Sequence, residues 1–196
     1  MRRLVFGPLL GNGIFTQDGK SWERSRALLR PAFQNRDLVL AEVVQAADSL
    51  IQLIPKAATV DLQPLFFRYT LDTTSYLLFG RRLGALESSI DEAVSSFAAA
   101  FDEGQDYLAR RGRLGGLYWL IDSINFRRRC RQVHKHVDEQ IHNALQNQDA
   151  SDNQPAYTIL GALVEQTRDL QVLREQCLNV LLAGRDTTAC LLSWTL

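Results

Sequence analysis

The chain has 196 residues, of which 46% are hydrophobic, and its 22 Lys and Arg residues balance 22 Asp and Glu residues. This length suits one domain or part of a larger one, and the hydrophobic share supplies a core, which excludes a disordered chain. The balanced charge argues against a nucleic-acid-binding protein that contacts phosphates with bulk positive charge. The three cysteines lie far apart without a Cys-x-x-Cys pair, which excludes a disulfide framework and a zinc ribbon and fits a reducing compartment.

No apolar run reaches membrane-spanning length. The nearest candidate, residues 179–196, carries Arg185 and Asp186 at its centre, where charge in lipid is costly. Met1–Leu4 is too short to be a signal peptide. The helical pattern continues to Leu196 without a stop signal, so we expect an internal piece of a longer protein.

In chain order, the pattern predicts a mainly α-helical fold. Gly7-Pro8, 11–13 and Asp18-Gly19 predict a loop-rich entry. Residues 59–62 have the character of a short strand, and 147–155 are expected to form a polar turn. Periodic apolar residues, caps and helix breakers predict helices over 18–30, 38–55, 64–80, 87–101, 126–145, 158–166 and from 168 to the end.

Trp22 and Arg26 lie one helical turn apart in the first of these helices. An indole N–H and a guanidinium on one face can donate to a single anion, such as a carboxylate or a phosphate. A cation–π pair on an exposed helix accounts for the same spacing. Both interpretations remain open for this pair.

The segment 110–135 is strongly basic and encloses an apolar, aromatic stretch at 114–121, with Asp122 as its single acid. Basic flanks around Tyr118 and Trp119 suit a membrane interface, where aromatic side chains anchor and Arg meets lipid phosphates. A solvated helix face beside a buried loop is the alternative.

His134, Asp138 and His142 recur every four residues along one helix. This spacing permits a metal site, but no further strong ligand is near, so we expect solvated surface histidines.

The last helix contains a stretch, 183–188, that breaks helical preferences. Gly184 costs about 1 kcal/mol relative to Ala in a helix interior, and Arg185 with Asp186 interrupts an apolar run. Ala183, Gly184 and Thr187 share one face, which forms a notch beside a hydroxyl. That hydroxyl can donate to the Ala183 carbonyl or to a ligand, and Asp186 can pass protons inward. The alternative is a Gly-kinked core helix with an exposed Arg-Asp step.

Ala183-Gly184-Arg185-Asp186-Thr187-Thr188 resembles the oxygen-activation motif of cytochrome P450, the heme-thiolate monooxygenases. Arginine within this motif and its apolar flanks are similar to the fungal alkane- and fatty-acid-hydroxylating branch. Trp22-x-x-x-Arg26, preceded by Gly13-Ile14-Phe15 and followed by Pro31-Ala32-Phe33, is similar to the family's propionate-binding helix. The resemblance covers essentially the whole chain, so residues 1–196 are expected to form part of a single P450 domain, from the propionate-binding helix through the oxygen-activation helix.

The resemblance implies heme b with its iron, O2, and electrons from NADPH supplied by NADPH-cytochrome P450 reductase. It implies hydroxylation of long aliphatic substrates, n-alkanes or fatty acids, at the cytosolic face of the endoplasmic reticulum membrane. Thr187 would hold the oxygen species and its ordered water, and Asp186 would feed protons toward them. Ala183 and Gly184 would leave room over the porphyrin, and Trp22 with Arg26 would neutralise a propionate. By the same resemblance, 87–101 and 126–145 are roof helices over the substrate cavity, and 110–131 contacts the membrane between them.

The cysteine loop Phe-x-x-Gly-x-Arg-x-Cys-x-Gly, which carries the axial thiolate, does not occur in the sequence. Cys190 is expected on the distal helix, on the wrong side of the heme. The family's Glu-x-x-Arg pair, like the membrane anchor, is expected to be absent from this chain. By itself the chain is therefore expected to be inactive. The alternatives are a truncated or degenerate helical product without stable heme and, more distantly, an all-α binding module.

Overall fold

The computed structural model describes residues 1–33, 37–87, 91–150 and 158–196. Within these ranges the fold is helical, as predicted, and no strand is present. The elements in chain order are α1 (Arg2–Leu10), α2 (Gly19–Leu29), the 3-10 helix η1 (Arg30–Phe33), α3 (Asp37–Leu53), α4 (Leu62–Phe79), α5 (Glu92–Leu114), the 3-10 helix η2 (Gly115–Ile121), α6 (Ile124–Ala150), α7 (Ile159–Val164) and α8 (Leu170–Thr195).

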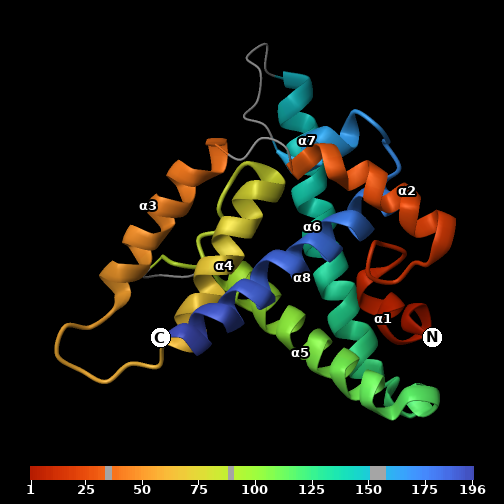
Figure 1. The fold of residues 1–196 in the computed structure, drawn as a ribbon, viewed down its shortest axis with the longest axis horizontal. Helices are drawn as coiled ribbons and strands as arrows, with labels where there is room; N and C mark the ends of the chain where they lie inside the picture. Colours follow the sequence, from red (N-terminus) through yellow and green to blue (C-terminus); the bar gives the residue numbers. More distant parts are fainter. Residues whose placement is uncertain (34–36, 88–90, 151–157) are drawn as a thin grey trace.

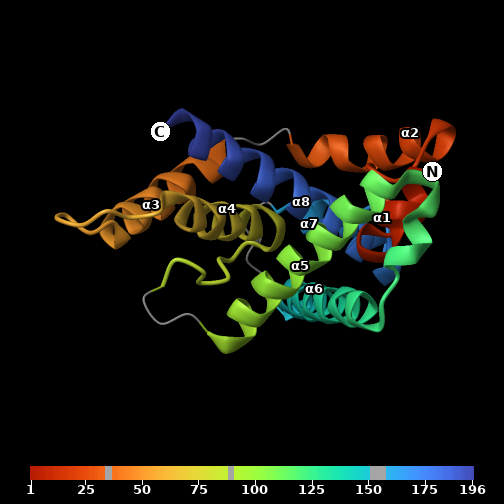
Figure 2. The ribbon, with the colours of Figure 1, turned by 90° about the horizontal axis from the view of Figure 1, so that it is seen from below.

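Helix α8 runs through the middle of the molecule and packs most extensively against α4, while α5 and α6 pack against each other (Figure 1). Seen from below, α2 and α8 lie on one side, and α6 lies on the opposite side with α5 crossing between (Figure 2). Every residue from Glu175 to Leu181 is buried. A helix that is covered on all sides over seven consecutive residues must be the central element of the core.

The main core is built from one apolar stripe of each surrounding helix. Its largest fully buried side chains include Phe97 and Phe101 of α5, Phe126 of α6 and Leu9 of α1. A smaller cluster joins Leu50 of α3, Phe66 of α4 and Ala189 of α8 with neighbouring residues. The helical period of 3.6 residues therefore identified the buried faces of α5 and α6. On α3 it did not, because Leu40, Val44 and Ile51 of the expected apolar stripe are exposed.

The predicted loop-rich entry is wrong over its first part, because Arg2–Leu10 form α1 with Pro8 inside the helix. Proline has no N–H to donate to the carbonyl four residues earlier, which leaves the Leu4 carbonyl free of its helical partner. Arg111 of α5 supplies the missing donor: its Nη2 donates to the Leu4 carbonyl at 2.8 Å and its Nε to the Val5 carbonyl at 3.0 Å. A partner from 107 residues away thus permits a helix that local rules disfavour.

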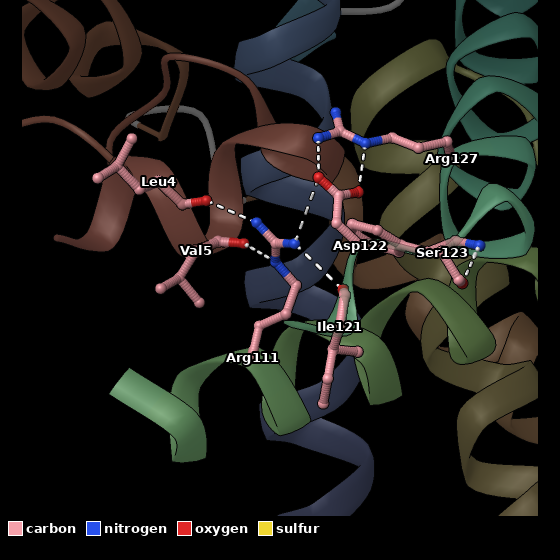
Figure 3. Close-up of polar contacts among 8 residues, drawn as sticks. Leu4, Val5, Arg111, Ile121, Asp122, Ser123 and Arg127 are labelled. Carbon is pink, nitrogen blue, oxygen red and sulfur yellow. Dashed lines mark hydrogen bonds and ion pairs between the residues drawn. The ribbon is translucent and has the colours of Figure 1, made fainter. Parts of the chain in front are cut away.

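Arg111 also fixes the turn between α5 and α6 (Figure 3). Its Nη1 donates to the Ile121 carbonyl at 3.2 Å and lies 3.8 Å from Asp122, which also pairs with Arg127. The guanidinium lies 5.0 Å from the centre of the Tyr118 ring. The side chain is only 1% exposed, so burial lowers the pKa of Arg111 while Asp122 opposes this shift. One buried cation therefore joins α1, η2 and the start of α6.

The predicted strand at 59–62 is also wrong. Thr59 and Val60 have no regular structure, and Asp61 is the N-cap of α4, whose side chain accepts from the Gln63 N–H at 3.0 Å. A capping carboxylate offers the backbone a helix start in place of a strand partner.

The helix boundaries that differ most from the expected ones are those of α5 and α6. Helix α5 extends to Leu114, well beyond residue 101, and α6 extends to Ala150. Residues 147–150 of the predicted polar turn are therefore helical, and residues 151–155 lie outside the described residues. Asp18 occupies the N-cap of α2, but its side chain pairs with Arg2 and makes no cap bond. Thr158 and Asp169 cap α7 and α8 with their side chains, which confirms both predicted starts.

Candidate functional site

A cavity of about 480 Å³ lies between α2, η1, α4, α8 and the loop after α1. Most of its walls are apolar, and two arginines stand among them. The residues that line it are Ile14, Phe15, Arg26, Leu29, Arg30, Phe33, Thr74, Leu77, Asn179, Val180, Ala183 and Gly184. The two sequence motifs, at 13–33 and 183–188, thus contribute to one cavity although they are separated by some 150 residues of chain.

The α8 wall of the cavity is formed by the predicted notch. Val180, Ala183 and Gly184 line it, as their shared helical face requires. A Cβ atom added to Gly184 would lie 2.6 Å from Oγ1 and 2.9 Å from Cγ2 of Thr74 on α4. Gly184 is therefore needed for the close approach of α4 to α8, and Thr74 occupies part of the notch.

Asn179 of α8 is hydrogen-bonded to the loop after α1, which forms another wall of the cavity. It is fully buried, its Oδ1 accepts from the Phe15 N–H at 3.0 Å, and its Nδ2 donates to the Leu10 carbonyl at 3.0 Å. Gly13 passes so close that an added Cβ would lie 2.1 Å from the Asn179 amide nitrogen. The amide holds the loop with Ile14 and Phe15 against the cavity.

Trp22 and Arg26 form the cation–π pair, with the guanidinium carbon 5.5 Å from the indole ring centre. Both side chains are exposed. Arg26 lines the cavity and has no ion-pair partner among the described residues, whereas Trp22 is not part of the lining. The sequence had left the two interpretations open, and the structure supports the cation–π pair with Arg26 still available to an anion.

Thr187 lies one turn beyond the cavity and is exposed. Its hydroxyl donates to the Ala183 carbonyl at 2.6 Å, one of the two arrangements expected for it. A hydroxyl that satisfies its donor in this way still offers its oxygen lone pairs.

Arg185 and Asp186 do not form the exposed step that the alternative interpretation required. Arg185 is 3% exposed, its Nη1 lies 2.7 Å from Asp102 of α5, and the same nitrogen lies 3.2 Å from Asp186. Its guanidinium carbon lies 4.9 Å from the Phe67 ring centre and 5.5 Å from that of Phe101. Burial raises the pKa of Asp186, and the Arg185 charge partly opposes this. A carboxyl with this balance is suited to taking up and releasing protons.

The expected surface position is wrong for His134. Its Nε2 lies 2.8 Å from the Leu9 carbonyl, and burial lowers the pKa of its imidazole. Asp138 pairs with Arg174 at 2.8 Å, and His142 is exposed as expected. Throughout the described ranges, no three His, Cys, Asp or Glu side chains gather closely enough to hold a metal ion.

Two of the three cysteines are buried. Burial raises the pKa of the Cys130 and Cys177 thiols to about 12 each, so neither ionises readily. Cys190 is exposed on α8. The Glu-x-x-Arg spacing, expected to be absent, does occur at Glu23–Arg26 and at Glu165–Arg168. In the part of the chain that the structure describes, neither of these pairs forms an ion pair.

The turn between α5 and α6 presents large apolar side chains to solvent. Leu117, Trp119 and Leu120 of η2 are 52%, 59% and 60% exposed, and Ile124 at the start of α6 is 86% exposed. The basic residues on either side of this turn belong to α5 and α6, and the apolar stretch between them forms the 3-10 helix η2. Most of the segment predicted to be a loop is therefore helical. Among the described helices, none is long and apolar enough to cross a bilayer.

Several cavity residues were not identified from the sequence, notably Thr74, Leu77 and Asn179. Thr74 and Leu77 belong to a helix whose apolar residues suggested only a core. Asn179 carried a usable signal, since a lone amide inside an apolar run must find buried hydrogen-bond partners.

The structure thus combines a helical fold, an apolar cavity against the central helix α8, Arg26 in the lining of that cavity, and the acid–alcohol pair Asp186 and Thr187 on the same helix. The solved structure described as the crystal structure of cytochrome P450DA heme domain is similar in fold, with a TM-score of 0.72 at 20% identity over 98% of this chain and 41% of that one.

The sequence comparisons name the family. A family model described as Cytochrome P450 matches residues 4–196. A cytochrome P450 of Arthroderma benhamiae is 49% identical over 95% of this chain and 39% of its own length, and cytochrome P450 52A9 of Candida maltosa is 39% identical over 97% of this chain and 39% of its own length. The chain belongs to the cytochrome P450 family. It spans about two fifths of the length of these relatives.

Proposed function

We propose that this chain forms the distal side of a heme-dependent monooxygenase site that hydroxylates long aliphatic substrates, n-alkanes or fatty acids. The observation that carries the proposal is the single cavity shared by Arg26 and by the Ala183–Gly184 wall of α8. Membership of the cytochrome P450 family supports it. Residues 1–196 would then be part of one such domain.

The cavity suits heme b. A porphyrin is flat and apolar with carboxylates at one edge, and this cavity has apolar walls with Arg26 and Arg30 among them. Arg26, oriented by the Trp22 ring, would neutralise a propionate, and Ala183 with Gly184 would leave space for the macrocycle. When bound, heme supplies the iron chemistry that activates O2 with electrons from NADPH, delivered by NADPH-cytochrome P450 reductase.

Asp186 and Thr187 would move protons at the distal face. The Asp186 carboxyl takes protons from solvent, because burial raises its pKa without closing it off completely. The Thr187 hydroxyl would accept a hydrogen bond at its oxygen while it donates to the Ala183 carbonyl. Positioned proton transfer of this kind typically contributes about 10²–10⁴-fold to a rate.

We further propose that the enzyme lies at the cytosolic face of the endoplasmic reticulum membrane and that the exposed apolar residues of η2 contact the membrane surface. Arg110, Arg113 and Arg128 stand beside this face and suit anionic headgroups. Trp119→Ser should weaken binding of the full-length protein to anionic vesicles. Trp194→Ser, at an even more exposed tryptophan outside this segment, is its control. Equal losses for both variants would remove the membrane role of 110–131.

The proposed function is tested with the full-length gene product, supplied with heme, reductase, NADPH and a fatty acid or n-alkane. Hydroxylated product with heme bound supports the proposal, and Thr187→Val, which keeps the side-chain volume, should lower product formation by about 10²-fold or more without loss of heme. A protein that folds and retains no heme would contradict it and favour the degenerate helical alternative.

A further inference from the structure

The polar groups that face Asp186 come from α5, the helix that crosses over α8. Asp102 and Gln105 are three residues apart on α5 and therefore lie on one face of it. Gln105 hydrogen-bonds the Asp186 carboxyl, and Asp102 pairs with Arg185 at 2.7 Å. A charged cluster of Asp102, Arg185 and Asp186 thus joins the two helices.

Arg185 is held in an unusual way. Its guanidinium lies against the rings of Phe67 and Phe101, and its Nε has no hydrogen-bond partner although it is buried. Both of its ion pairs use Nη1, which lies 2.7 Å from Asp102 and 3.2 Å from Asp186. The aromatic rings fix the plane of the guanidinium, so Nη1 cannot turn fully toward one carboxylate without leaving the other.

Stability alone gives no reason for this arrangement. A buried guanidinium loses its hydration, and its orphaned Nε adds to the cost, while Asp102 is half exposed and is a weak compensating partner. An apolar residue would pack against Phe67 and Phe101 at lower cost. Arrangements that break local rules without a gain in stability point to function.

We propose that Arg185 is a positioning residue that divides its charge between Asp102 and Asp186, so that the roof helix α5 controls how firmly the Asp186 carboxylate is held. This inference rests on the proposed function, in which Asp186 passes protons. Neutralising Asp102 gives Asp186 the undivided guanidinium, and removing Arg185 leaves Asp186 with Gln105 alone.

The two substitutions have opposite effects on Asp186. Asp102→Asn removes a like charge and frees Nη1, both of which favour the ionised carboxyl, so the pKa of Asp186 falls. Arg185→Met removes the cation and keeps a long apolar chain between the rings, so the pKa of Asp186 rises. Direct charge effects give the same two signs, so the coupling between the two substitutions decides whether Arg185 divides its charge.

The test follows the aspartate side-chain carboxyl carbons by ¹³C NMR during a pH titration of the full-length protein, loaded with heme and held in its reduced, carbon-monoxide-bound, diamagnetic state. The Asp186 signal is the one that is absent from Asp186→Asn. Asp138→Asn, which breaks the 2.8 Å pair between α6 and Arg174 of α8, is the matched control and should leave the Asp186 titration unchanged. If Arg185→Met does not fold, Arg185→Lys keeps the charge without the planar guanidinium whose Nη1 both carboxylates share. Asp102→Asn should then shift the pKa of Asp186 less than it does beside arginine.

A double-mutant cycle separates the role of Arg185 from direct repulsion. The proposal requires that Asp102→Asn lower the pKa of Asp186 in the parent and shift it much less in the Arg185→Met protein. Equal shifts in both backgrounds would mean that Asp102 acts through space alone, and this would overturn the proposal, as would shifts of the same sign for Asp102→Asn and Arg185→Met. Because the titration needs no turnover, loss of hydroxylation refutes the proposed function without affecting this result.

Discussion

Asn179→Ala tests whether one buried amide holds the cavity wall formed by the loop after α1. The substitution removes the acceptor of the Phe15 N–H and the donor to the Leu10 carbonyl, both 3.0 Å bonds. The Leu10 carbonyl is buried and loses its partner outright, at a cost of about 1–3 kcal/mol, whereas water can reach the partly exposed Phe15 N–H, at about 1 kcal/mol. The third bond, to the Glu175 carbonyl, costs little, because the backbone N–H of the helix still serves that carbonyl.

Alanine gains about 0.7 kcal/mol in helix propensity over asparagine, so the net loss of stability is roughly 1–3 kcal/mol. Asn143→Ala, at an exposed position of α6, makes the same chemical change without buried bonds and should stay within about 0.5 kcal/mol of the parent. The difference between the two variants, measured by urea unfolding of the full-length protein, isolates the buried bonds from helix propensity. Faster transfer of heme from Asn179→Ala to apomyoglobin is also expected, since Ile14 and Phe15 line the cavity. Equal stability losses for the two variants would refute this account of the wall.

Three further outcomes are expected. Gly184→Ala should destabilise the protein by roughly 1–3 kcal/mol through its contact with Thr74 and should reduce heme binding. Adding Thr74→Ala to the same protein should recover part of both losses, as measured by unfolding and by heme titration. If neither loss is recovered, the contact is not their cause. Of the three cysteines in this chain, only Cys190 should react with a thiol reagent in the folded protein at neutral pH, because the two buried thiols have a pKa of about 12; mass spectrometry of the labelled peptides decides this. Burial lowers the pKa of His134 in the folded protein. Below the ordinary histidine pKa of ~6.5 the unfolded chain therefore binds a proton that the folded chain does not bind, and stability falls as the pH falls. His134→Gln should flatten this pH dependence in urea unfolding, and an unchanged pH dependence would exclude His134 as its source.

Most of the helices could be predicted from the sequence, because their apolar residues recur with the helical period of 3.6 residues. N-cap residues such as Asp169 indicate where some of these helices begin. The sequence also predicted that the stretch at 183–188 is a site, since glycine, charge and hydroxyl there oppose local preference together. Family membership followed from the same residues, because the motifs near Arg26 and Thr187 stand in a fixed order.

Local rules failed where distant residues supply a missing partner. Pro8 is typical of a helix break, yet α1 forms, because Arg111 donates to the Leu4 carbonyl that the proline leaves open and to the neighbouring Val5 carbonyl. Arg185 reads as exposed, yet it is buried between two aromatic rings contributed by α4 and α5. The cavity itself depends on which helices cross at Thr74 and Gly184 and on the amide of Asn179. Such contacts join residues more than 80 positions apart, so no local period or cap encodes them, and only the packing of the helices decides them.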